Sequence, residues 1–84
     1  MEQGKKYVEL LNAFYDNHVL ALTIAGIISA DTLDSVDKCD KAIETLTRLY
    51  NAIPHSDIDD KESWERKFVA AIEVAKDTKE ELGG

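Results

Sequence analysis

Apolar residues recur at helical spacing in two segments of the chain. Between residues 32 and 53 they follow one another at intervals of three and four, which places them on one side of a helix. They are Val36, Cys39, Ile43, Leu46, Tyr50 and Ile53, flanked by Leu33, Ala42 and Leu49. Between about residues 59 and 82 a second stripe holds Trp64, Phe68, Ala71, Ala75, Thr78 and Leu82, with Ile72 beside it. Both segments are predicted to be amphipathic helices.

Two breaks separate the predicted helices. Asp31, with Asp34 three residues later, has the chemistry of a helix N-cap and marks the start of the 32–53 helix. Pro54 ends that helix, and the acidic residues after it complement the positive end of the next helix dipole. Three acid-before-base pairs are expected on the outer side of the 32–53 helix: Asp34–Lys38, Asp37–Lys41 and Glu44–Arg48.

The first predicted helix, residues 5–28, changes character along its length. Its first half is amphipathic, with Tyr7, Leu10, Leu11 and Phe14 on one side. From Val19 to Ile28 no side chain is charged, and the helix is apolar nearly all round. Such a helix must be covered on every side, and two neighbouring helices cover only part of its circumference. Alternatively, Gly26 marks a helix end, which would reduce the uncovered surface to an ordinary loop contact.

Together the three segments predict an all-α fold in which residues 1–84 form a single domain, a three-helix bundle of up-down-up topology. The stripes predict small crossing angles between the helices. Val8, Tyr15, Val19 and Leu22 form a second apolar line along the 5–28 helix. We predict that this line is an interface through which the chain forms a homo-oligomer or binds another protein. The alternative, a helix that is simply central in the bundle, fits the same pattern.

Charge and cysteine content narrow the function classes. With 17 acidic and 10 basic residues the chain has a net charge of −7, so direct nucleic-acid binding is not expected. One cysteine excludes an internal disulfide, which favours a cytoplasmic protein. The most apolar stretch, Val19 to Ile28, is about half as long as a membrane-spanning helix requires, so no membrane partner is expected.

No residue pattern points to catalysis, a metal or a cofactor. Counted from Asp57, the acidic cluster at residues 57–62 lacks the glycine and the glutamate of a calcium loop, and we interpret it as a helix start. Cys39, His18 and His55 lack the close paired spacing of a zinc site. We expect Cys39 to be a small core residue, His18 to be a core or interface histidine, and His55 to be solvated.

The leading hypothesis is a small, acidic, non-enzymatic protein-binding module that acts through the apolar side of the 5–28 helix. Bacterial and phage-type inhibitors, immunity proteins and accessory proteins include chains of this class. The alternative is a self-assembling helical protein that binds or sequesters a nucleotide-like ligand at subunit interfaces. Tyr7 or Tyr15 would then stack on the ligand, while Lys5, Lys6 or Arg66 contacts its phosphates. A small hydrolase or metal enzyme is a third hypothesis, which bound metal in the purified protein would support.

Overall fold

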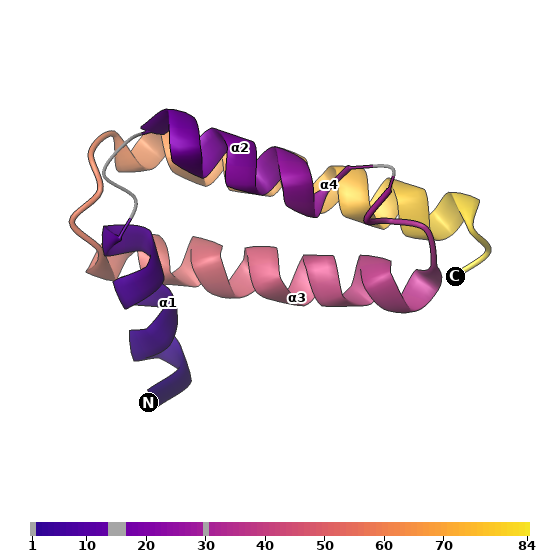
Figure 1. The fold of residues 1–84 in the computed structure, drawn as a ribbon, viewed down its shortest axis with the longest axis horizontal. Coiled ribbons are helices and arrows are strands. Elements are labelled where there is room, and N and C mark those ends of the chain that lie inside the picture. The colour runs from indigo at the N-terminus through magenta and orange to yellow at the C-terminus, as the bar shows by residue number, and fades with distance from the viewer. Residues whose placement is uncertain (1, 14–16, 30) are drawn as a thin grey trace.

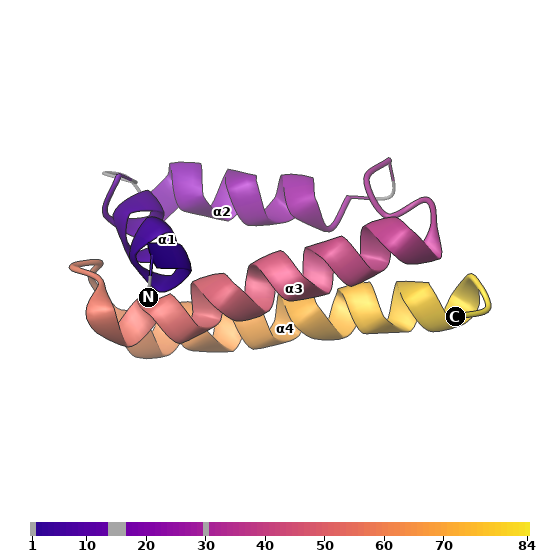
Figure 2. The ribbon, with the colours of Figure 1, turned by 90° about the horizontal axis from the view of Figure 1, so that it is seen from below.

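The computed structural model describes residues 2–13, 17–29 and 31–84, with side chains from residues 5, 18 and 31 onward in these three stretches. The described residues contain helices and no strand, which confirms the all-α prediction. The elements are α1 (Glu2–Asn12), α2 (Asn17–Ile27), α3 (Val36–Ala52), the 3₁₀ helix η1 (Ile53–His55) and α4 (Lys61–Glu81). α2, α3 and α4 run in alternating directions, and α1 crosses the end where α2 begins (Figure 1, Figure 2).

α3 and α4 form an antiparallel hairpin that builds most of the core. The predicted stripes are confirmed at their centres, because Leu46, Trp64 and Phe68 are almost completely buried. α3 ends and η1 begins next to Pro54, as predicted, because Pro54 has no backbone N–H to continue the helix. Near the other end of the hairpin the Lys79 ammonium lies 2.8 Å from the Asp40 carboxylate, which joins the two helices.

Three predicted details of this hairpin are wrong. The N-cap of α3 is Ser35 and not Asp31: the Ser35 hydroxyl accepts a 3.3 Å hydrogen bond from the backbone N–H of Lys38. Leu82 is exposed, because α4 ends at Glu81 and Leu82 lies in the closing turn. Of the three acid–base pairs, Asp34–Lys38 (3.1 Å) and Glu44–Arg48 (2.7 Å) form, but no ion pair joins Asp37 and Lys41.

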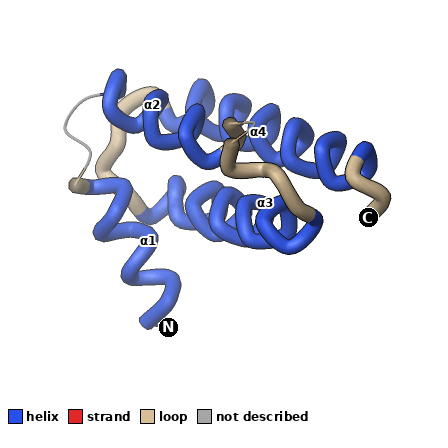
Figure 3. The backbone as a smooth tube through the Cα atoms, turned by 45° about the vertical axis from the view of Figure 1, so that its right-hand side comes forward, coloured by secondary structure: helices blue, strands red, loops and turns tan. Residues whose placement is uncertain are grey.

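The segment between α2 and α3 forms a turn for a physical reason. Leu33 is buried against the hairpin, and a helix starting at Thr32 would have to give up the contacts that this turn makes. The Thr32 hydroxyl donates a 2.8 Å hydrogen bond to the carbonyl of Gly26 and so closes the C-terminal end of α2. Figure 3 shows this connection as a loop that returns the chain to α3. α2 ends at Ile27, one residue after Gly26, which was the alternative helix end considered from the sequence.

The predicted single helix over residues 5–28 is wrong, because this segment forms two helices, α1 and α2, that point in different directions (Figure 1). The bundle therefore contains four α-helices among the described residues, not three. Leu11 and Leu20 are nine residues apart, which is about two and a half turns of an α-helix, so one continuous helix would place them on opposite sides. Both are buried, at 0% and 1% exposure. Breaking the helix between them lets both enter the same core.

α1 is held at the end of the hairpin by apolar and polar contacts. Leu11 is its buried residue, and Tyr7 and Val8 pack half-buried against the core. The Asn12 side-chain oxygen accepts a 2.7 Å hydrogen bond from the backbone N–H of Asp57, in the loop before α4. This bond joins residues far apart in the sequence and fixes where α1 ends.

The hairpin core can be tested by truncation. We expect Leu46→Ala and Phe68→Ala each to lower the free energy of unfolding by about 2–5 kcal/mol, because the buried side chain is replaced by a cavity. Lys76→Ala on the exposed side of α4 should change it by less than about 0.5 kcal/mol. Urea denaturation of the three variants measures the difference. A lysine variant as destabilised as the other two would contradict the assignment of the helix faces.

Asp60 provides a test of the α4 start. Its backbone is left-handed, with φ 61° and ψ 48°, and its side chain makes no capping hydrogen bond. Asp60→Val should lower the free energy of unfolding by about 1–2 kcal/mol, because a β-branched residue is strained there. Asp60→Gly should retain the stability of the parent, since glycine adopts this conformation freely. Asp59 has ordinary backbone geometry, so Asp59→Val is the matched control, and an equal cost at both positions would refute the explanation.

Candidate protein interface

α2 is the helix whose apolar residues the fold leaves partly uncovered. Leu20 and Ile24 are buried, and Ile27 is half-buried, which gives a single inward stripe at spacings of four and three. The remaining side turns to solvent. Its exposed residues are His18, Val19, Ala21, Leu22, Ala25 and Gly26, which together are called the α2 outer face.

The α2 outer face is largely apolar and contains no Asp, Glu, Lys or Arg residue. Val19 is 46% exposed and Leu22 is 59% exposed, and α2 contains no acidic or basic residue apart from His18. The Thr23 hydroxyl donates a 2.9 Å hydrogen bond to the carbonyl of Val19 and is therefore turned back onto its own helix. A methyl group added at Gly26 would meet nothing within 4 Å, so the space over that residue is open. A second helix could approach this surface closely.

Exposed apolar residues on α4 have charged neighbours, unlike those of the α2 outer face. Val69 and Val74 on α4 are 46% and 43% exposed, similar to Val19. Exposed charged residues neighbour them at helical spacing on the same helix: Arg66 and Glu73 beside Val69, and Asp77 beside Val74. Isolated apolar side chains of this kind are normal on protein surfaces. The uncharged continuity of the α2 outer face distinguishes it from them.

The predicted interface residues do not all lie on the same surface. Val19 and Leu22 lie together on the α2 outer face. Val8 does not share their line, because it belongs to α1 and packs half-buried against the core. Tyr15 lies outside the described residues. Ala21, Ala25 and Gly26 were not predicted, although their helical phase relative to Leu20 and Ile24 would have identified them.

His18 is exposed, so the core alternative of its prediction is wrong, and the interface alternative stays a prediction. It precedes Leu20 by two residues, which is about 200° around the helix, and it therefore faces away from the inward stripe. Cys39 is buried in α3, as predicted. α2 and α3 run in opposite directions, so His18 and Cys39, each near the start of its helix, lie at opposite ends of the bundle (Figure 1). His18 and Cys39 are therefore too far apart to act together as a base and a nucleophile. His55 is exposed in η1, as predicted.

The residues proposed to hold a nucleotide are not assembled into one site. Arg66 lines a shallow hollow whose other lining residues are Tyr50, Glu62, Glu65, Val69 and Ala70. Tyr7, Lys5 and Lys6 do not line it. Tyr7 instead has the Arg48 guanidinium 5.9 Å from its ring centre, which occupies one face of the ring. Two acidic side chains beside Arg66 also disfavour phosphate there.

The described residues form no metal site and no membrane-spanning helix. Within them, no group of three or more histidine, cysteine or acidic side chains is placed to hold a metal ion. No helix formed by these residues is both long and apolar enough to cross a bilayer. The acidic residues before α4 lie at a helix start, with Asp60 as N-cap and Glu62 in the first turn.

The chain matches no protein-family model, no curated protein and no solved structure. The fold and the surface define a small, acidic, all-helical protein with one uncharged apolar helix face. What that face does must be inferred from its own residues.

Proposed function

We propose that this chain is a non-enzymatic protein-binding module that binds through the α2 outer face. The observation that carries this proposal is the exposure of Val19 and Leu22, 46% and 59%, on a helix without an Asp, Glu, Lys or Arg residue. Contiguous exposed apolar surface in a soluble protein marks an interaction site or an aggregation hazard. Charged residues make up 32% of this chain, yet the exposed positions 19 and 22 are apolar. A binding role explains why apolar residues occupy them.

Charge favours this face as the contact between two acidic proteins. The chain carries a net charge of −7, and most of its surface would repel a second copy. Copies that meet through the α2 outer face bring no acidic side chain of α2 into the contact. A two-fold homodimer is the commonest assembly of soluble proteins, and a second copy is therefore the first partner to test.

The size of the face limits the kind of complex. α2 has eleven residues and is about 16 Å long. A stable interface buries about 800 Å² on each partner, which is more than one side of so short a helix supplies. The partner therefore also contacts surface beside α2, or the complex is transient. A larger interface that includes surface beside α2 and a transient complex are both compatible with an inhibitor, immunity or accessory protein of the cytoplasm. This is the role that we propose for the module.

A paired substitution tests the proposal. Val19→Glu combined with Leu22→Glu should abolish self-association, because two charges would have to be buried in the contact. Val69→Glu combined with Val74→Glu is the matched control, since these α4 residues have similar exposure and should leave association unchanged. Sedimentation velocity over a wide range of concentration measures the oligomeric state, and circular dichroism verifies that each variant remains helical.

If the parent chain is monomeric throughout, a second measurement addresses a different protein as partner. A photo-crosslinking residue placed at position 22 should give discrete products in the native host, whereas the same residue at position 69 should not. Equal products from the two positions, together with a monomeric parent, would refute a binding role for the α2 outer face.

A further inference from the structure

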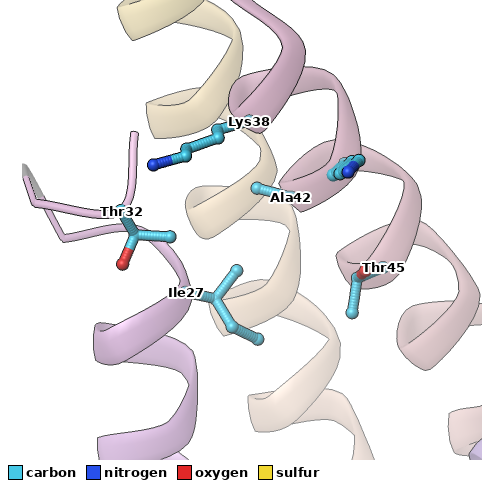
Figure 4. A pocket seen from close by; sticks show the side chains of 6 residues that line it. Ile27, Thr32, Lys38, Ala42 and Thr45 are labelled. Atoms are coloured by element: carbon cyan, nitrogen blue, oxygen red, sulfur yellow. The ribbon is translucent and has the colours of Figure 1, made fainter. Parts of the chain in front are cut away.

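On the other side of α2 lies a hollow of about 240 Å³, between its last turn and the first half of α3 (Figure 4). This surface is distinct from the α2 outer face. The residues that line it are Ile27, Thr32, Lys38, Lys41, Ala42 and Thr45, and they are called the Lys41 hollow. In Figure 4 the Ile27 side chain points from α2 toward α3, on which Ala42 and Thr45 lie.

Small side chains from α3 and α4 lie beside the Lys41 hollow. Cys39, Ala42 and Ala75 are buried at this level together with the larger Leu33, whereas Leu46 and Phe68 are buried further along. Helix separation is set by the largest side chains at a contact, so a layer of small residues next to them leaves volume unfilled. The unfilled volume opens to solvent beside α3.

Its lining combines aliphatic and basic side chains. Ile27 and Ala42 supply aliphatic surface, and two lysines, Lys38 and Lys41, also line the hollow. Lys38 already pairs with Asp34 at 3.1 Å. Lys41 makes no ion pair within the described part of the chain. In a protein of net charge −7, an unpaired ammonium beside apolar surface fits an anion that also has an apolar part.

We propose that the Lys41 hollow binds a small amphipathic carboxylate. Its aliphatic chain lies on Ile27 and Ala42, and its carboxylate accepts hydrogen bonds from the Lys41 ammonium, a charge-assisted contact. The α3 residues that line the hollow, Lys38 to Thr45, extend about 10 Å along the helix. The volume is below the range of about 300–1,000 Å³ for drug-sized ligands, so a medium chain fits better than a long one.

The two threonines that line the hollow, Thr32 and Thr45, have different roles. Thr32 donates its proton to the Gly26 carbonyl at 2.8 Å, so this side chain holds the wall of the hollow in place. Thr45, one turn beyond Lys41 on α3, has a hydroxyl within the same lining. The carboxylate is therefore placed on the Lys41 side of the hollow, with the chain directed across Ala42 toward Ile27.

Octanoate, kept below its micelle concentration, is the probe that tests this proposal. We expect it to shift the methyl resonances of Ile27 and Ala42 saturably in a spectrum of labelled protein. Lys41→Gln should weaken binding roughly two- to fivefold, the range expected for an exposed ion pair. Lys76→Gln, an exposed lysine on α4, is the matched control and should leave binding unchanged. Ala42→Leu should fill the hollow and abolish the shifts.

Head-group and chain controls decide which part of the ligand is recognised. Octylammonium should not compete, and acetate should bind more weakly than octanoate. Equal binding of octylammonium, or an equal effect of Lys41→Gln and Lys76→Gln, would overturn the proposal, and so would the absence of shifts at Ile27 and Ala42. If Ala42→Leu does not fold, the Lys41→Gln comparison still decides, because that residue is exposed and its loss leaves the core intact.

Discussion

Burial of both Leu11 and Leu20 in the core of the α3–α4 hairpin is the constraint on which the N-terminal half depends. Each buried leucine contributes roughly 1.5–3 kcal/mol of transfer free energy. A continuous helix would bury only one of the two, because nine residues place them on opposite sides. The chain therefore breaks, α1 crosses the end of the hairpin, and α2 lies along it (Figure 2).

That break determines what α2 exposes. An isolated helix of eleven residues is not stable in water, so α2 depends on Leu20 and Ile24 for its place in the fold. Val19 and Leu22 contribute little to this anchoring, since they are 46% and 59% exposed. Polar residues there would keep the helix and improve solubility. Apolar residues at positions that folding leaves free are the physical basis of the proposed interface.

The unequal filling of the core has a second consequence. The level with Leu46, Trp64 and Phe68 is bulky, whereas at the level of Cys39, Ala42 and Ala75 only Leu33 is a large buried side chain. The Lys41 hollow lies beside this level, between the last turn of α2 and the first half of α3. The two proposed surfaces thus lie on opposite sides of α2 and have different causes: one is surplus apolar surface, and the other is missing core volume.

The sequence by itself determined the hairpin, because the evidence for α3 and α4 is local. Their stripes, the break at Pro54 and the burial of Cys39 follow from spacing within each helix. Val19 and Leu22 could be recognised as surplus for the same reason. The tertiary structure decided the rest: the break between Leu11 and Leu20, the exposure of His18, the half-burial of Val8 and the turn that buries Leu33. When a helix is apolar on all sides, the element that packs against it determines which side becomes buried. That neighbour, the hairpin formed by residues 36–81, follows later in the sequence, and only packing brings it to α2.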